Sequence, residues 1–324
     1  MNFATLQGLT IPEGVVTQIT DASGRVLWAL QDDVPIVLEV AKITSDTYAG
    51  STTYSGEQFV LLDIYPKTAS SKVNVTYGGL TKTLAFSGTN AQQVYFGTFY
   101  GVADEVETPA SGELIIAGGC VAFAIGVYNK PGLSSGKSAT AYCSCITDVQ
   151  SWGGVTTIPQ YAFYQCTALA LTELPNGITS IGDYAFCECN GNRFTHWPSA
   201  LKTIGERAFQ GYYFEYLPRE IPEGVVSIGA YAFYDPLGMT SSSDAIEMTL
   251  PSTLKTIGDY AFMTPYWEDR ACFLRTIKIL ATIPPSAGTF GDITFMREVI
   301  VPAGCGEAYK AAWREFADVI VEAS

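Results

Sequence analysis

At 324 residues the chain is long enough for two or three domains with a substantial core. Its formal net charge of −14 excludes a nucleic-acid partner, because DNA and RNA binding requires clustered Lys and Arg. Hydrophobic residues make up 48% and charged residues only 15%, which predicts a folded chain. Frequent Tyr, Phe, Val, Ile and Thr favour a mainly β fold.

The ends of the chain carry no targeting segment that we recognise. The first residues lack a basic stretch followed by an apolar one, so no signal peptide is expected. No run approaches the roughly 18 apolar residues that span a bilayer, so no membrane insertion is expected.

Residues 1–33 predict an N-terminal hairpin that serves as an attachment segment, with Asp21 and Gly24 near its tip. Ile19, Asp21, Gly24 and the run Val26-Leu27-Trp28 resemble an Ile-x-Asp-x-x-Gly-x-Val-Leu-Trp motif of phage and prophage tail-associated proteins from gut Firmicutes. The resemblance implies a virion protein, which leaves the cell by lysis and needs no signal peptide.

Residues 34–130 predict a β-sandwich-like domain, because short apolar runs alternate with turn signals about every ten residues. Gly78-Gly79 joins two of the runs as in a hairpin. Residues 131–138 are rich in Ser and Gly and predict a loop or linker, so the junction with the next domain falls around 130–150. The predicted strands are 34–40, 58–65, 72–77, 81–86, 93–97, 113–116 and 121–128.

An internal repeat with the pattern Ile-Gly-x-x-Ala-Phe follows. The Phe residues are 23, 23, 24 and 29 positions apart by subtraction. An apolar residue followed by Pro recurs in phase with this pattern. The pattern copies are 157–163, 180–186, 203–209, 227–233 and 256–262. The apolar-Pro pairs are Leu174-Pro175, Trp197-Pro198, Ile221-Pro222, Leu250-Pro251 and Ile283-Pro284.

Such a unit cannot bury its apolar side alone, so successive units must stack their Ile, Ala and Phe residues into a solenoid core. The glycines of the pattern fit a turn in which φ is positive. Those glycines are Gly182, Gly205, Gly229 and Gly258.

The repeats resemble the BspA-like class of bacterial leucine-rich repeats over residues 145–324. The segment from Val301 to Trp313 resembles the C-terminal cap of that class, so the cap covers about 301–324. The cap helix is expected from Gly306 to about Phe316, with Tyr309, Ala312, Trp313 and Phe316 on one side. The resemblance implies a microbial surface or secreted protein that adheres to host proteins, other cells or glycans.

The eight cysteines include two Cys-x-Cys pairs, Cys143/Cys145 and Cys187/Cys189, but no Cys-x-x-Cys. Residues two apart on a strand make a poor chelate, so we predict no metal and interpret the cysteines as buried free thiols. Cys166 and Cys189 occupy the same repeat position, which Tyr212 takes in the next copy.

Nothing in the sequence points to catalysis, and we predict neither an enzyme nor a cofactor. The single histidine, His196, stands at a variable repeat position, where we interpret it as solvent-facing. The sequence has no nucleophile elbow, phosphate-binding loop or calcium loop. A pair of distant carboxylates acting on polysaccharide stays open, because acids far apart in sequence can meet in space.

Two groups of residues are candidate binding positions. The residue two before each repeat Pro predicts an outward row along the solenoid: Glu173, His196, Glu220, Thr249 and Thr282. Exposed aromatics are the second group, with Tyr213 in the third copy and Tyr266 and Trp267 in the last. Each has a plain structural interpretation as well, a solvated strand face for the row and core packing for the rings.

The sequence therefore predicts a non-catalytic recognition or adhesion protein that binds a cell-surface protein or glycan through the solenoid, as an extracellular virion component or at a cell surface. The alternative is a structural virion or surface protein whose solenoid packs against other virion proteins. Oligomerisation stays open.

Overall fold

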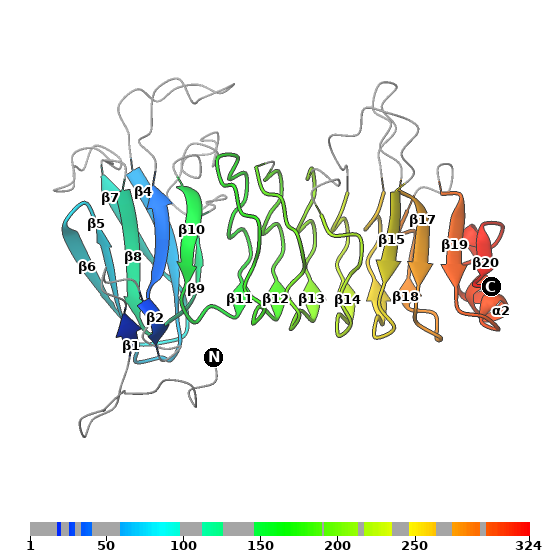
Figure 1. Cartoon of the computed structure of the whole chain (residues 1–324), viewed down its shortest axis with the longest axis horizontal. Helices are drawn as coiled ribbons and strands as arrows, with labels where there is room; N and C mark the ends of the chain where they lie inside the picture. Colours follow the sequence, from blue (N-terminus) through cyan, green and yellow to red (C-terminus); the bar gives the residue numbers. More distant parts are fainter. Residues whose placement is uncertain are drawn as a thin grey trace.

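The computed structural model describes residues 18–20, 26–29, 34–40, 59–97, 112–125, 146–189, 191–212, 217–234, 246–263, 274–291 and 296–324. Antiparallel sheets occupy the N-terminal end, stacked coils follow along the long axis, and a short helix lies near the C-terminus (Figure 1). Strands dominate these residues, which confirms the prediction of a mainly β protein.

The N-terminal hairpin consists of β1 (Gln18–Thr20) and β2 (Val26–Ala29), which pair antiparallel. Its tip at 21–25 and the proposed linker at 131–138 lie outside the described residues.

The next strands form two antiparallel sheets. The five-stranded sheet has the order β10-β3-β8-β5-β6, and the three-stranded sheet has the order β7-β4-β9. The strands predicted between 34 and 128 are confirmed in position to within a few residues. Their bounds are β3 Ile36–Val40, β4 Phe59–Pro66, β5 Lys72–Tyr77, β6 Leu80–Ala85, β7 Gln92–Gly97, β8 Gly112–Gly118 and β9 Cys120–Ala124.

Local sequence explains how these strands turn and pack. Gly78 and Gly79 adopt φ of 59° and 84°, which a two-residue hairpin turn between β5 and β6 requires. The two sheets touch where the ring of Tyr77 on β5 meets the edge of Phe96 on β7, with centroids 5.8 Å apart. Alternate residues of β5 are buried, as expected for strands with one face on a core.

Strand β10 (Ile146–Trp152) belongs to both parts of the molecule. It pairs antiparallel with β3 along one edge. On the other side, the backbone N–H of Ala170 in the next coil donates to the carbonyl of Thr147 (3.1 Å). The prediction placed residues 145 onward in the repeat domain alone. Strand β10 instead completes the N-terminal sheet as well, so the two parts share a strand.

The repeat coils are aligned by a parallel six-stranded ladder of two-residue strands. Each short strand places an outward Ser or Thr before an inward apolar residue, and Ser180 and Ile181 pair with Thr203 and Ile204 in register. The strands are β11 Thr157–Ile158, β12 Ser180–Ile181, β13 Thr203–Ile204, β14 Ser227–Ile228, β16 Thr256–Ile257 and β18 Ser286–Ala287.

The repeat phenylalanines form a continuous stack inside the coils. Phe209 lies between Phe186 and Phe233, with centroid separations of 5.5 Å on both sides and rings within 10° of parallel. All three rings are at most 1% exposed. Cys166, Cys189 and Tyr212 are buried together, as predicted for their shared repeat position. The stacked Ile, Ala and Phe core expected from the pattern is confirmed.

The glycines of the pattern have a different role from the predicted one. None of Gly182, Gly205, Gly229 and Gly258 is among the residues with positive φ. A Cβ on Gly205 would instead lie 2.6 Å from the backbone N of Asp183 in the preceding coil. The expectation of positive φ is therefore wrong, and glycine is required because neighbouring backbones approach too closely for a side chain.

The last clear repeat mark, Ile283-Pro284, is also out of register. Leu250 pairs with Ile279, whereas Ile257 pairs with Ala287, so one extra residue lies between these pairs in the later coil. Leu250 therefore aligns with Ile279 and not with Ile283, four residues later. Ile283 is 78% exposed, although Leu254, which likewise lies four residues after Leu250, is 3% exposed.

The later coils carry a second parallel sheet in the order β15-β17-β19-β20, which faces the viewer in Figure 1. Its strands are β15 Ile246–Leu250, β17 Leu274–Ile279, β19 Glu298–Val301 and β20 Ile320–Glu322.

Helix α2 (Gly306–Ala312) and a 3-10 turn, Arg314–Phe316, close the last coil. Tyr309, Trp313 and Phe316 are buried as predicted, but Ala312 is exposed. The α-helix ends at Ala312, before the expected Phe316, because Trp313 leaves helical geometry with ψ of 67°.

The carboxylate of Glu322 holds the start of this cap. Its oxygens accept hydrogen bonds from the backbone N–H groups of Gly304 (2.9 Å) and Gly306 (2.8 Å). These bonds lower the pKa of Glu322. Strand β20 therefore fixes the helix to the end of the solenoid.

Candidate functional site

The structure aligns the predicted outward row on one face of the solenoid. The N–H of Thr195 donates to the carbonyl of Thr172 (3.0 Å), so His196 stands beside Glu173 one coil away. Glu220 pairs with Thr249 in a parallel bridge. Glu173 and His196 therefore lie in adjacent coils, as do Glu220 and Thr249, and the phase of the repeat places the two pairs along one row.

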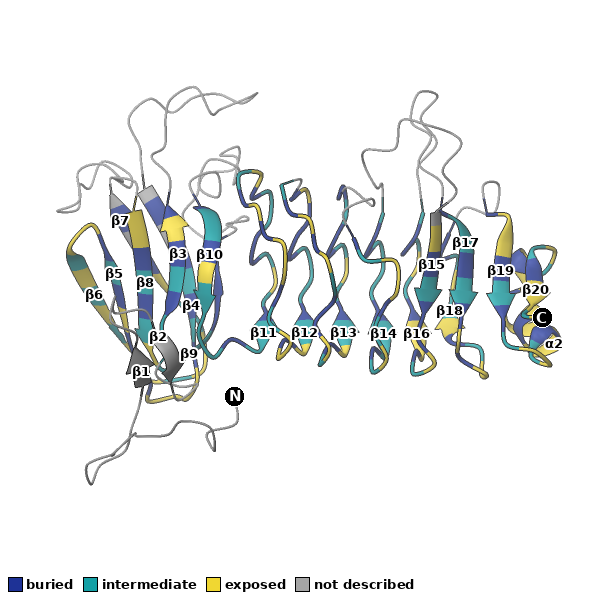
Figure 2. Cartoon of the chain, viewed as in Figure 1, coloured by how far each residue is buried: buried dark blue, intermediate teal, exposed yellow. Residues whose placement is uncertain are grey.

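Each row residue immediately precedes a buried apolar residue of its coil. Buried and exposed stretches follow one another along every coil in Figure 2. Glu173 and Glu220 are exposed, whereas His196 and Thr249 are half-buried. The Nδ1 atom of His196 lies 3.1 Å from the hydroxyl of Thr195, so the ring is held beside its chain neighbour at the surface.

Thr282 does not belong to this row, contrary to the prediction. Thr249 pairs with Lys278, which pairs in turn with Ile300, and Ile300 pairs with Val321. Thr282 lies four residues after Lys278 and beyond the end of β17 at Ile279, on the loop that follows. The face therefore changes along its length from acidic and polar to basic and apolar.

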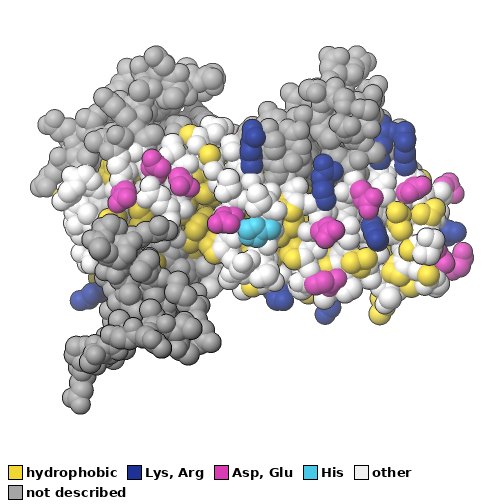
Figure 3. All heavy atoms as spheres, in the orientation of Figure 1, with side chains coloured by type: hydrophobic (Ala, Val, Ile, Leu, Met, Phe, Trp, Pro, Cys, Tyr) yellow, Lys and Arg dark blue, Asp and Glu magenta, His cyan; other side chains and the backbone are white. Residues whose placement is uncertain are grey.

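The acidic part of this face continues onto the N-terminal sheet. Glu113 pairs with Glu39, and Glu39 pairs with Asp148 on the shared strand β10. Like charges directly opposite one another oppose strand pairing. Acidic side chains accordingly gather over both the sheet and the first coils (Figure 3).

Tyr213, Tyr266 and Trp267, the predicted aromatic candidates, lie outside the described residues, as do the insertions at 237–244 and 264–270.

A second surface stripe lies just after the short strands, at the second variable position of the Ile-Gly-x-x-Ala-Phe pattern. Five residues at this position place their side chains one above another from coil to coil, and each residue has a positive φ between 53° and 58°. This left-handed conformation costs about 1–3 kcal/mol for residues other than glycine. We call these residues the tyrosine–arginine stripe: Tyr161, Tyr184, Arg207, Tyr231 and Tyr260.

Aromatic stacking holds the stripe together. Tyr161 stacks on Tyr184 with centroids 4.9 Å apart, and Tyr231 lies 5.1 Å from Tyr260. Between these pairs, the guanidinium of Arg207 lies 5.7 Å from the ring centroid of Tyr184 and 4.2 Å from that of Tyr231. Cation–π attraction and stacking offset part of the backbone cost.

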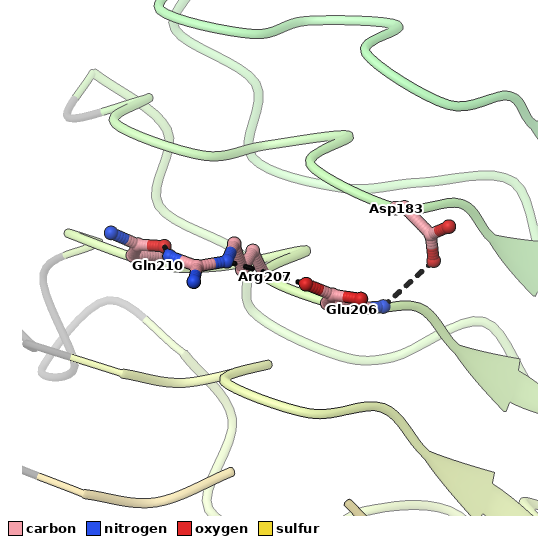
Figure 4. Close-up of polar contacts among 4 residues, drawn as sticks. All are labelled: Asp183, Glu206, Arg207 and Gln210. Atoms are coloured by element: carbon pink, nitrogen blue, oxygen red, sulfur yellow. Dashed lines mark hydrogen bonds and ion pairs between the residues drawn. The ribbon is translucent and has the colours of Figure 1, made fainter. Parts of the chain in front are cut away.

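Polar contacts hold Arg207 in place within the tyrosine–arginine stripe (Figure 4). Its Nη1 donates to Oε1 of Gln210 (2.8 Å), and its Nε lies 3.4 Å from Oε1 of Glu206. The backbone N–H of Glu206 donates to the carboxylate of Asp183 one coil away (2.8 Å). The cation is thus positioned by its own coil and by both neighbours.

Sequence reasoning missed this stripe. Tyr occupies the variable part of the pattern in four of the five copies, at 161, 184, 231 and 260, and this recurrence was the available signal. Positive φ at tyrosine cannot be anticipated, because glycine and asparagine are the residues that favour it.

The described cysteines are structural. Cys120, Cys166, Cys187, Cys189 and Cys305 are free, and all but Cys305 are buried. Burial raises the pKa of Cys187 to about 12, with Glu188 and Cys189 adding to the rise. Burial likewise raises the pKa of Cys120 to about 12. A thiol with this pKa is protonated at neutral pH and does not act as a nucleophile.

We expect iodoacetamide at pH 8 to alkylate Cys305 well before Cys120 and Cys187 in the native protein. A thiol with a pKa of 12 is only ~0.01% thiolate at that pH. Peptide mass mapping during a time course measures the order, and denatured protein provides the control in which all three react alike. Labelling of native Cys187 as fast as in the denatured control would contradict this assignment.

Stacked parallel coils with a repeating apolar core and a capped end define a leucine-rich repeat protein. Residues 134–266 and 212–299 match the BspA type leucine rich repeat region, in six copies. The chain belongs to this family. Leucine-rich repeats generally mediate protein binding or adhesion and are generally non-catalytic.

A solved leucine-rich repeat protein from Bacteroides ovatus ATCC 8483 is similar, with 21% sequence identity and a TM-score of 0.27. The similarity covers 50% of this chain and 57% of that protein. No curated protein matches the sequence. Among the described residues, no helix has the length and apolar character needed to cross a membrane.

Proposed function

We propose that the chain is a non-catalytic recognition protein that binds a cell-surface protein or glycan through its repeat solenoid. The observation that carries the proposal is the row of Glu173, His196, Glu220 and Thr249, which combines carboxylate, imidazole and hydroxyl side chains along one face of the coils. Backbone hydrogen bonds between adjacent coils hold these positions, so little backbone freedom is lost on binding, which favours affinity.

The proposal also covers location and organisation. Residues 1–33 act as the attachment segment, residues 34–130 form a sandwich-like unit, and residues 145–324 are the recognition unit. The resemblance of the hairpin around Asp21 and Gly24 to tail-associated proteins supports an extracellular role as a phage tail component. BspA-type proteins are commonly surface or extracellular proteins, which is consistent with either a virion or a cell surface.

Binding of the fluorescent full-length chain to a panel of gut Firmicutes cells tests the function. We expect the combined change Glu173→Ala, His196→Ala, Glu220→Ala and Thr249→Ala to weaken binding at least about tenfold, because it removes all four contacts. The control changes Thr179→Ala, Lys202→Ala and Lys255→Ala, which are exposed positions beside the short strands.

We call Glu173, His196, Glu220 and Thr249 the strand row, and the chain with all four changed the strand-row variant. Equal binding by this variant and by the control would exclude the strand row as the recognition face. Failure of the folded, unchanged chain to bind any cells would instead favour the structural alternative, in which the solenoid packs against neighbouring proteins.

A further inference from the structure

The tyrosine–arginine stripe has the composition of a protein-binding surface. Tyr and Arg are the residues that protein interfaces most enrich, and Lys is depleted from them. Tyr164 and Tyr234 widen the stripe, each meeting a stripe tyrosine edge-on, with centroids 5.8 Å from Tyr161 and 5.2 Å from Tyr231. The stripe tyrosines are half-buried, so each ring is supported by the coil and still presents surface to solvent.

The stacking decides which part of each ring a ligand can reach. The faces of Tyr184 and Tyr231 are covered by their stacked neighbours and by the guanidinium of Arg207. At these two central rings, the ring edges are what a ligand can contact. Stacking of a sugar ring requires a free aromatic face, so this geometry favours a polypeptide, whose side chains pack against ring edges.

Carboxylates border the stripe on both sides. The residue immediately before each stripe residue is Asp183, Glu206 or Asp259 in three coils. Glu188 lies on the other side, where its carboxylate accepts a hydrogen bond from Gln165 (2.6 Å). An aromatic centre with an acidic margin is complementary to a surface that presents Lys and Arg around an apolar patch.

The stripe is also preorganised. Its four spacings of about 4.8 Å between parallel strands give a length of roughly 19 Å, which matches about six residues of an extended peptide. Because stacking already fixes the rings, little side-chain freedom is lost when a partner docks. Arg207 shows within the chain itself that a guanidinium fits between two of these rings and beside a carboxylate.

We propose that the tyrosine–arginine stripe docks a segment of a partner protein that carries Lys and Arg. This inference rests on the proposed recognition function and narrows it from a protein or glycan to a basic protein surface. The partner's cations pair with the carboxylates of Asp183, Glu206 and Asp259, and their aliphatic stems pack on the tyrosine edges.

A yeast-displayed library of random peptides, selected against the immobilised full-length chain, tests the inference. The stripe variant combines Tyr184→Asn and Tyr231→Asn, because asparagine accepts the left-handed backbone while removing the ring. The four-residue strand-row variant serves as the matched control, and thermal melts verify that both variants fold.

We expect the selected peptides to carry net positive charge, to bind the stripe variant at least about tenfold more weakly, and to weaken as salt rises. The strand-row variant should bind them like the unchanged chain. Selection of no binders, or of peptides that bind the stripe variant equally well, would overturn the inference. So would a glycan on an array that binds the chain and loses binding in the stripe variant.

The two proposals fail separately. Cell binding that survives in the stripe variant but not in the strand-row variant leaves the recognition function standing and removes the stripe. If the chain binds peptides at the stripe but binds no cells, the stripe inference stands and the proposed recognition of cells is removed.

Discussion

Substituting Phe209→Ala should lower the free energy of unfolding by about 3–5 kcal/mol, because it empties a fully packed site. Phe209 is 1% exposed, stacks between Phe186 and Phe233 at 5.5 Å, and receives the edge of Trp197 at 5.3 Å. In a solenoid each coil contacts only its neighbours, so the substitution weakens the interfaces of this coil, through which the first and last coils unfold together. Denaturant unfolding followed by circular dichroism and fluorescence measures the change.

The same experiment has an internal comparison. Phe209→Leu keeps an apolar side chain in the stack and should cost clearly less than Phe209→Ala. We further expect the two optical signals to separate in Phe209→Ala, since weakened coupling lets the two ends unfold independently. A loss below about 1 kcal/mol, the ordinary effect of a substitution, would show that the ring stack does not hold the coils together.

Gly205→Ala should lower the free energy of unfolding by about 1–3 kcal/mol through overpacking. The new Cβ would lie 2.6 Å from both the backbone N of Asp183 and the carbonyl carbon of Gly182. Backbone atoms cannot rotate away as a side chain can, so the two coils must separate. Separation strains the hydrogen bond from the Gly205 N–H to the carbonyl of Ile181 (2.8 Å). Thermal and denaturant unfolding both report the loss.

Gly177→Ala is the matched control, because a Cβ there meets nothing within 4 Å and its φ is ordinary. It should leave stability unchanged or raise it by up to about 1 kcal/mol, since alanine restricts the unfolded chain. Equal losses for the two alanines would mean that glycine at 205 serves flexibility and not close approach.

The core of the coils can be predicted from sequence because its signal is periodic. Ile181, Ala185 and Phe186 recur with fixed spacing, and fixed spacing is what stacking in register requires. Strand positions in the N-terminal half follow from alternating apolar residues for the same reason. Register over the last coils could not be predicted, because Ile283-Pro284 imitates the repeat mark, whereas the residue that pairs with Leu250 is Ile279, four positions earlier.

The two candidate surfaces also differ in how much of each can be predicted from the sequence. Glu173, His196 and Glu220 could be placed in a row because the apolar-Pro mark sets their phase. The partners of Arg207 could not, because Tyr184 and Tyr231 come from other coils and meet the guanidinium only through the left-handed turn. The physical reason for glycine at 205 was equally hidden, since it depends on the backbone of the neighbouring coil.

The shared strand β10 gives the molecule a mechanical property that a flexible linker would remove. Its pairing with β3 on one side and the bond from Ala170 on the other join the sheet and the coils through a single stretch of chain. Tension applied to a partner held on the solenoid passes to the N-terminal sheet through several hydrogen bonds loaded together. The shared strand therefore restricts rotation of the solenoid on the sheet, and the fold sets the direction in which the solenoid faces a partner.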